Sequence, residues 1–525
     1  MAKITTKATF KDFNPDQPQL LPQNLEELIG QDHLVRVIRR VVDQMDLSEI
    51  INKYPGGGSS AYHPQMMIKV LLYAYSLKIY TGRKIALVMR QDIGFMWLAA
   101  FNTPDFRTIN EFRSGELKQS IEELFKSMLV FLVENKYVKF ETYFVDGTPI
   151  AADANKHKMV WKKNAVRYKE AVEKKCEELF KEIDVLNEQE DQEYKNHDLE
   201  QTGSGTLPIT PEKITQQITE LNSIIEKTVD NKKKQRRAGS LKKQLEKHQE
   251  KIKTYENQLA ITGERSGYSK TDTDAVAMHM KNEETLPAYN AIIGTEDQFV
   301  VNFSIHQNGS DNAGFKEHME QLQKHTDKKP EVINGDAGFG SEQNYEIIEE
   351  MKTGNFLKYN NFHQEQTVKH KNDRFHKDHF AYDPSTDSYQ CPNNRKLTYR
   401  RKTQITNQRT GYVSTIKEYR CESCAGCPFA AACKKPKEKD RLIKINEKWE
   451  RYKKQAYDNL TSEKGILLRK RRGVDVESVF GDLKMNQGFR RFHVRGKEKV
   501  KAEFGILVMS HNLRKIHLQD LQKAS

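Results

Sequence analysis

Two aspartates stand at the ends of apolar segments, each close to glycine. Asp336 follows Val332 and Ile333 in the stretch VINGDAGFG, and Asp146 follows the strand-like stretch TYFV. An aspartate in such a place is most often an ordinary turn residue. Carboxylates at the ends of neighbouring strands can also converge on a hard divalent cation, which prefers oxygen ligands. The pattern therefore predicts Asp146 and Asp336 as candidate metal ligands.

A third acid lies in the stretch VDVESVFGDLKMNQGFRRFHVRGKEK near the C-terminus. At helical spacing, Val476, Val479 and Leu483 form an apolar stripe. Glu477 and Lys484 are seven residues apart and share a face beside that stripe. We therefore predict a helix that directs a metal-binding carboxylate and a phosphate-binding ammonium group the same way.

A basic run with interleaved Phe489 and Phe492 follows the predicted helix. Basic side chains that alternate with aromatic rings are typical of DNA-contacting segments. A phosphodiester is opened readily by two divalent ions about 3.5–4 Å apart, so acids and cations here suggest chemistry on a nucleic acid. The candidate DNA-binding residues are Lys484, Arg490, Arg491, Arg495 and Lys497.

Bulk properties agree with a polyanionic partner. The 525 residues include 86 Lys and Arg but only 73 Asp and Glu, a formal net charge of +13. That balance favours nucleic acid over a membrane surface. No apolar run approaches the roughly 18 residues that span a bilayer, and the N-terminal stretch lacks the features of a secretory signal. We expect a cytoplasmic protein with no membrane contact.

Changes in composition divide the chain into segments, of which at least two should be domains. In the first, short helices carry basic residues, namely Arg83, Lys84, Arg90, Arg107 and Arg113. The predicted segments are 1–138, an all-helical DNA-binding or assembly domain; 139–164 and 265–379, two parts of a catalytic core; 165–264, a helical insertion; 380–440, a cysteine-rich insertion; and 441–525, a helical and basic C-terminal region.

Outside the insertions, the predicted order is strand, hairpin, helix, strand, helix, strand, helix. This order predicts an α/β fold with a mixed sheet flanked by helices. The 165–264 insertion has the spacing of a helical hairpin or short coiled coil. We interpret its basic stretch at 231–237 as a solvated connector, with phosphate contact as the alternative.

Five of the six cysteines lie between residues 391 and 433. Two-residue gaps between cysteines are typical of tetrahedral zinc sites. We predict a structural zinc ribbon, with a redox cluster or a merely buried set of thiols as alternatives. The preferred ligands are Cys391, Cys424, Cys427 and Cys433, with Cys421 as the alternate and His376 or His379 as further alternatives.

Several stretches occur together in a meaningful order, among them YHPQMMIKVLLYAYSLKIYTGRK, PDFRTINEFR, FVDGTPIAADANKHKMVWKK, SKTDTDA, INGDAGFGSEQNY, CESCAGCPFAAAC and VESVFGDLKMNQGFRRFHVRG. With them the chain resembles the DDE transposases of bacterial insertion sequences, whose core has the ribonuclease-H-like fold. The resemblance implies Asp146, Asp336 and Glu477 as the first, second and third acids. It also implies two Mg²⁺ or Mn²⁺ ions, the element's terminal inverted repeats and target DNA as double-stranded partners, and a homodimer or larger assembly in the bacterial cytosol or nucleoid. The glycines near Asp336 would leave room for DNA.

One departure concerns the third acid. Related transposases often carry a tyrosine–arginine–glutamate–lysine signature, with arginine four residues before the glutamate and lysine seven after it. Lys484 fits this signature, whereas position 473 is Gly, position 470 is Lys, and Arg472 stands one place too early. We take Arg472 as the nearest substitute for the signature arginine and also as a candidate DNA-binding residue.

Other acids compete for these roles. Asp153 replaces Asp146 if the first strand ends later, and Asp311 is expected to cap a helix. The remaining competitors are Asp272, Asp274 and Asp482. The expected activity is metal-dependent DNA cleavage followed by strand transfer. The alternatives are a transposase-derived DNA-binding protein that no longer cuts, and a nuclease of the same fold that cuts without joining.

Overall fold

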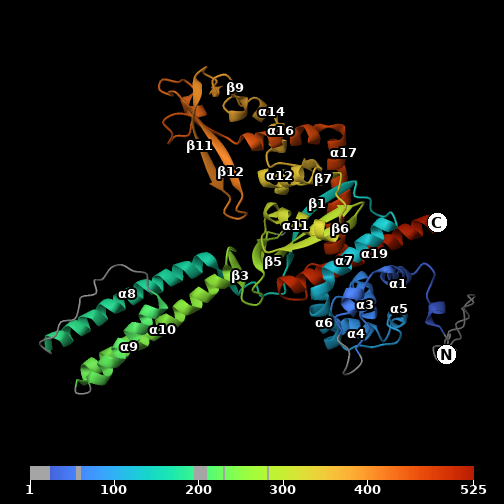
Figure 1. The fold of residues 1–525 in the computed structure, drawn as a ribbon, viewed down its shortest axis with the longest axis horizontal. Helices are drawn as coiled ribbons and strands as arrows, with labels where there is room; N and C mark the ends of the chain where they lie inside the picture. Colours follow the sequence, from blue (N-terminus) through green and yellow to red (C-terminus); the bar gives the residue numbers. More distant parts are fainter. Residues whose placement is uncertain (1–23, 55–60, 194–209, 229–230, 281–282, 525) are drawn as a thin grey trace, which may run out of the picture.

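The computed structural model describes residues 24–54, 61–193, 210–228, 231–280 and 283–524 (Figure 1). Residues 1–23, to which the expectation about a secretory signal refers, lie outside these ranges. Within them, no helix has both the length and the apolar character needed to cross a bilayer.

A six-stranded mixed sheet forms the centre of the molecule, in the order β4-β5-β1-β7-β8, with β6 paired to β5. The β1–β5 and β5–β6 pairs are antiparallel, whereas β1–β7 and β7–β8 are parallel. The predicted mixed α/β fold is therefore confirmed. The strands are β1 (Thr142–Ala151), β4 (Val276–His279), β5 (Thr285–Glu296), β6 (Phe299–His306), β7 (Val332–Gly335) and β8 (Gly354–Leu357).

Helices cover the central sheet. Strand β6 is buried along its whole length because α11 (Asp311–His325) and α19 (Lys497–Ala524) both pack against it. The sequence of this strand, FVVNFSIH, nevertheless alternates in its second half, so the polar Asn302, Ser304 and His306 are buried as well. Helix α12 (Glu342–Glu350) follows β7 and packs on β8, which completes the predicted strand–helix–strand order.

The N-terminal helices gather around the C-terminal helix α19 (Figure 1). Arg113, expected among the surface cations, is buried instead, and its Nη1 lies 3.5 Å from Oε1 of Glu503 on α19. The hydroxyl of Tyr75 donates to the same carboxylate at 2.9 Å. The helices are α1 (Leu34–Gln44), α2 (Ser48–Ile51), α3 (Pro64–Ser76), α4 (Gly82–Val88), α5 (Ile93–Leu98), α6 (Phe106–Ser114) and α7 (Glu116–Glu134), after a 3-10 turn at Leu25–Leu28.

The insertion between β1 and β4 is a helical arm that projects from the sheet (Figure 1). Its described residues form α8 (Lys162–Glu193), α9 (Pro211–Lys227) and α10 (Lys232–Thr262), with α8 and α9 both packed on α10. The consecutive helices α9 and α10 pack on each other as the expected helical hairpin would, and α8 adds a third helix. The prediction of a connector at 231–237 is wrong, because Asn231 accepts a hydrogen bond from Lys234 N and starts α10. A short antiparallel ribbon, β2 (Met159–Trp161) with β3 (Gly267–Ser269), closes the base of the arm.

The cysteine-rich insertion contains a five-stranded antiparallel sheet in the order β13-β12-β11-β10-β9. Two helices, α16 (Glu447–Thr461) and α17 (Glu463–Arg472), lead back to the central sheet. The strands are β9 (Ala381–Asp383), β10 (Ser388–Gln390), β11 (Lys396–Thr406), β12 (Val413–Cys421) and β13 (Leu442–Ile445); short helices lie at Phe362–Glu365, Val368–Lys371, Lys377–His379 and Ala430–Cys433.

Helix α19 approaches α7 closely at a glycine, which gives a test of this packing. A Cβ at Gly505 would lie 2.4 Å from Cγ1 of buried Ile121, so we expect Gly505→Ala to destabilise the protein by about 1–3 kcal/mol. The control is Gly481→Ala in the helix Ser478–Gly481, where a Cβ meets no atom within 4 Å. Chemical denaturation measures both midpoints, and equal midpoints would contradict the packing.

Candidate functional site

The parallel pairing of β1 with β7 brings the two predicted aspartates together. Val145 pairs with Gly335, and the next residue on each strand is an aspartate, Asp146 or Asp336. Neighbouring strands are about 4.8 Å apart, so the two carboxylates emerge side by side. Asp336 accepts a hydrogen bond from Ala337 N at 2.7 Å and starts the 3-10 turn Ala337–Phe339. The structure therefore places the two acids side by side on interior strands, although β1 continues to Ala151, so the expectation that this strand ends at Asp146 is wrong.

The glycines beside these aspartates make room for the protein itself. A Cβ at Gly340 would lie 2.2 Å from the carbonyl oxygen of Lys358, just after β8. A Cβ at Gly147 would lie 2.1 Å from Oδ1 of Asp311. The space beside Gly340 is therefore filled by the protein's own backbone. The expectation that this glycine leaves room for DNA is wrong.

Arg472 joins the first and third predicted acids. Its Nη2 lies 3.1 Å from Oδ1 of Asp146, and its Nη1 lies 2.7 Å from Oε1 of Glu477. The guanidinium is buried, so Arg472 contacts the acids from inside rather than presenting a surface for DNA. All three predicted acids thus lie around one corner of the sheet, since the charge of Asp336 also acts on Asp146.

A π-helix explains why Arg472 stands one place too early. Residues Gly473–Glu477 form π-helical turns, in which hydrogen bonds run from residue i to i+5. The wider turn takes up one extra residue, so an arginine five positions before Glu477 reaches the place that an α-helix gives to position four. The departure from the signature is therefore compensated by local geometry.

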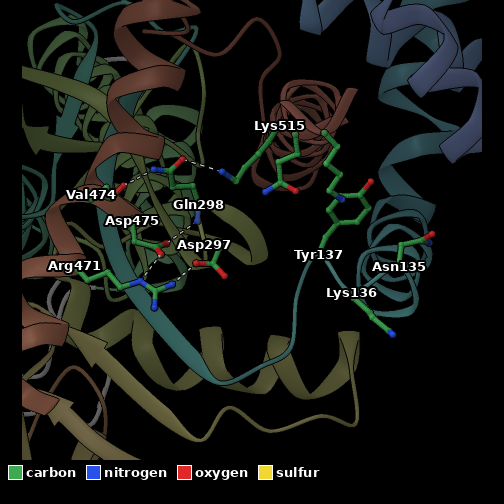
Figure 2. A pocket seen from close by; sticks show the side chains of 11 residues that line it. Asn135, Lys136, Tyr137, Asp297, Gln298, Arg471, Val474, Asp475 and Lys515 are labelled. Atoms are coloured by element: carbon green, nitrogen blue, oxygen red, sulfur yellow. Dashed lines mark hydrogen bonds and ion pairs between the residues drawn. The ribbon is translucent and has the colours of Figure 1, made fainter. Parts of the chain in front are cut away.

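The other face of this π-helix fixes it to the β5–β6 turn. Asp475 accepts hydrogen bonds from the Thr295 hydroxyl at 2.7 Å and from Gln298 N at 3.0 Å. Arg471 pairs with Asp297 in the same turn. Figure 2 shows Asp475, Gln298, Arg471 and Asp297 along a polar pocket that also includes Lys515. Because Asp475 is held there, Glu477 is left facing Arg472 and Asp146.

Lys484 braces the third-acid segment against β1. Its ammonium group donates to the Thr148 hydroxyl at 2.5 Å and to the Pro149 carbonyl at 2.7 Å. It lies in a second π-helix, Asp482–Asn486. Lys484 therefore contacts β1 directly, whereas Glu477 is joined to Asp146 on this strand through Arg472.

The basic run after Lys484 is partly engaged within the protein. Arg491 and Arg495 both pair with Asp153, and Lys497 pairs with Glu317 at 3.0 Å. Arg490 is exposed. The interleaved Phe489 and Phe492 are buried and contact each other, so they belong to the core rather than to a stacking surface for bases.

Most of the competing acids have structural partners elsewhere. Asp272 accepts from the Tyr289 hydroxyl at 2.9 Å, Asp274 accepts from Lys497 N at 2.8 Å, and Asp482 accepts from Gln487 and pairs with His511. Asp153 lies beyond the end of β1 with its arginines. None of these contacts involves the residues around Arg472.

Asp311 is the exception. Ser310 is the N-cap of α11, so the prediction that Asp311 caps this helix is wrong. The Asp311 side chain instead accepts a hydrogen bond from Asn290 Nδ2 at 2.7 Å, next to Gly147. Its place in the sequence, at the start of a helix after Ser310, gave only the signal of a cap and hid this orientation.

Burial and mutual repulsion raise the proton affinity of these acids. Burial raises the pKa of Asp146 to about 6, with further contributions from Asp311 and Asp336, against the lowering effect of Arg472. Burial likewise raises the pKa of Asp311. Burial lowers the pKa of nearby Lys358, opposed by the charge of Asp336. The cluster therefore holds more negative charge than its own cations neutralise, which suits a bound cation.

Two transposase family models match parts of the chain. A model described as "Transposase DDE domain" matches residues 390–517, and one described as "Transposase domain (DUF772)" matches residues 23–115. Both matches support an insertion-sequence DDE transposase. No curated protein matches it. The DDE-domain match includes Glu477 and the clustered cysteines, whereas Asp146 and Asp336 lie outside both matches.

In this transposase, all five clustered cysteines line one small cavity. The cavity has a volume of about 10 Å³, close to that of one water-sized sphere. The four preferred ligands and the alternate Cys421 share it with Phe375, Phe429 and Arg441. Burial, with the neighbouring Cys424 thiol, raises the pKa of Cys421 to about 12. The thiols line an atom-sized space, but among the described residues the group whose ligand atoms all lie within 4.8 Å of one another is His370, His376 and Asp378.

The two histidines suggested as further zinc ligands lie apart from this cavity. His376 groups with His370 and Asp378, and the ligand atoms of these three residues lie within 4.8 Å of one another. Asp378 is also close to Lys453, with 3.9 Å between the charged atoms. His379 Nε2 donates a hydrogen bond to the His370 carbonyl oxygen at 3.0 Å.

The raised pKa of Asp146 gives a pH test. A cation must displace the proton, so we expect the Mn²⁺ affinity of the full-length protein to fall up to about tenfold per unit below about pH 6. The folded state holds this proton more tightly than the unfolded state, so the metal-free protein should lose stability as pH rises from about 4 to 6. Titration with Mn²⁺ measures the affinity, and Asp146→Asn should remove this proton dependence. An affinity equal at about pH 5 and 7 would contradict the assignment.

Proposed function

We propose that this transposase binds the ends of its own mobile element and catalyses DNA hydrolysis and strand transfer with Asp146, Asp336 and Glu477. The observation that carries the proposal is the convergence of these acids. Two come from adjacent parallel strands, and the third is tied to the first through Arg472. The bacterial cytosol or nucleoid is the proposed location, where element DNA and target DNA are both accessible.

The acid cluster fits Mg²⁺ or Mn²⁺, because it offers carboxylate oxygens in excess over its own cations. Two such ions, when bound, stabilise the charge on the attacking and leaving oxygens of a phosphodiester. Asp146, Asp336 and Glu477 are the proposed ligands. No activated serine or histidine nucleophile is required by this scheme.

The protein's own contribution is to hold these groups in place before the substrate arrives. The β1–β7 register sets the spacing of Asp146 and Asp336. Arg472 positions Glu477 against β1, and Lys484 fastens the following turn to Thr148. A site built on strands and a clamped helix loses little further freedom when it binds its ligands.

We also propose that the core is ribonuclease-H-like, as the resemblance implies. An antiparallel β5–β6 hairpin beside the parallel strands β1, β7 and β8, with one acid midway along β1 and another directly after β7, supports this. The proposed catalytic core comprises 139–164, 265–379 and the C-terminal region 441–525. The helices of 1–138 are proposed to bind DNA or to assemble subunits, with Arg83, Lys84, Arg90 and Arg107 on their surface.

The proposed DNA-binding surface begins with Arg490, Arg491 and Arg495, which are exposed beside the acid cluster. Asp153 holds Arg491 and Arg495 close together, which concentrates positive charge near the end of β1. Phosphate contacts from such residues position DNA without reading its sequence. A homodimer or larger assembly on paired ends is proposed from the resemblance.

Mutation of the third acid tests the activity. With DNA spanning the ends of the element and Mg²⁺, we expect Glu477→Gln to lower the cleavage rate by about a hundredfold or more, since loss of even an outer-sphere partner can cost 10–100-fold. Glu350→Gln, an exposed acid at the end of α12, is the matched control and should cleave normally. The readout is nicked DNA resolved at single-nucleotide length.

The products of the same reaction distinguish the alternatives. Joining of a cut end to new DNA supports a transposase, whereas cutting without joining supports a nuclease. DNA binding without cutting by either protein, in Mg²⁺ and in Mn²⁺, would leave a DNA-binding protein derived from a transposase.

We propose a structural zinc ion in the cysteine cavity. We expect purified protein to contain about one zinc per chain, and Cys424→Ser to lose it and unfold at a lower temperature. Cys176→Ala is the control, because Cys176 is buried in the arm, away from the cavity. Elemental analysis and thermal unfolding measure both effects. Full zinc content in Cys424→Ser, or none in wild type, would refute the site.

A further inference from the structure

Asp311 lies among the acids although it belongs to a different element. It is the first residue of α11, and its Oδ1 would be 2.1 Å from a Cβ on Gly147, the residue after Asp146. Its Oδ2 would be 3.4 Å from a Cβ on Gly338, two residues after Asp336. The Asp311 carboxylate therefore lies between Gly147 in strand β1 and the 3-10 turn that follows Asp336.

An acid in the first turn of a helix often only complements the helix dipole. The Asp311 side chain does more, because Asn290 on β5 donates a hydrogen bond to it at 2.7 Å and aims it across β1. Among the described residues, the hydrogen bond that holds this carboxylate thus comes from a neutral amide rather than from a cation. Its charge is left for another partner.

A second observation points to a ligand at this place. Asn290 is 2% exposed, and its Oδ1 has no hydrogen-bond partner among the described residues. A buried amide oxygen without a partner costs free energy unless a donor or cation satisfies it. Since the Nδ2 of the same amide contacts Asp311, the unsatisfied oxygen lies beside the acid cluster.

We propose that Asp311 is a fourth carboxylate of the metal centre and that Asn290 positions it there. The proposal rests on the proposed metal-dependent function. Two divalent ions carry four positive charges, whereas three carboxylates partly offset by Arg472 supply fewer than three negative ones. The Asp311 carboxylate brings the negative charge of the site closer to the positive charge of the two ions. Burial of Asp311 and the charge of Asp336 explain why the pKa of Asp311 is raised in the metal-free protein.

Metal binding without DNA tests this proposal. Mn²⁺ is titrated into the full-length protein and the free ion is followed by electron paramagnetic resonance. We expect Asp311→Asn to weaken Mn²⁺ binding about tenfold or more, as loss of a direct ligand should. Asp153→Asn should bind as wild type does, because that acid is paired with Arg491 and Arg495.

Thermal unfolding separates a ligand from a structural residue. A ligand predicts that metal-free Asp311→Asn is as stable as wild type or more so, because a buried negative charge is removed, while stabilisation by Mn²⁺ is reduced. A variant that is unstable without metal yet binds Mn²⁺ normally would overturn the proposal. Asn290→Ala should weaken Mn²⁺ binding less than Asp311→Asn does, because it leaves the carboxylate in place.

Glu477→Gln distinguishes failure of this inference from failure of the proposed function. If Glu477→Gln weakens Mn²⁺ binding and Asp311→Asn does not, the fourth ligand is refuted and the three-acid site stands. If neither substitution changes Mn²⁺ binding, both are refuted.

Discussion

The acid cluster depends on the two ion pairs made by the buried guanidinium of Arg472. This guanidinium reaches Asp146 on β1 and Glu477 on the C-terminal segment, two parts of the chain separated by both insertions. A buried ion pair gives little net stability, but loss of one partner leaves uncompensated charge and is strongly destabilising. Arg472 therefore fixes where the C-terminal segment meets the sheet. The π-helix, the Asp475 contacts and the Lys484 brace all follow from that placement.

The C-terminal helix α19 extends this constraint to the other end of the chain. It packs against β6 on one side and against α3 and α7 on the other. Its Glu503 is buried with Arg113 and Tyr75, so the N-terminal helices are joined to the core by polar contacts as well as by apolar packing. Such a network defines one relative arrangement of the packed elements, because any shift would leave a buried charge unpaired.

The sequence predicted the features that depend on local pattern. Strand-end position identified Asp336 correctly, whereas Asp146 lies midway along β1; helical spacing placed Glu477 and Lys484 on the segment that meets β1. The features that depend on tertiary context were missed. An i+5 turn cannot be read from residue types, so Arg472 looked misplaced, and Asp311 looked like a cap because Asn290 lies in a different strand. Phe489 and Phe492 were assigned to a DNA surface because the alternation of basic and aromatic residues does not show which side faces the core.

The β2–β3 ribbon at the base of the helical arm has a consequence for how this chain can change over time. Met159 pairs with Ser269, so the chain leaves the core and returns to it at neighbouring points. The entropy of closing a loop grows only slowly with its length, and the ribbon supplies the closing contacts. An arm of another length or sequence could therefore be grafted at this junction while β1 kept its pairing with β5. The arm is therefore free to diverge in length and sequence, whereas the register of the strands in the central sheet must stay fixed.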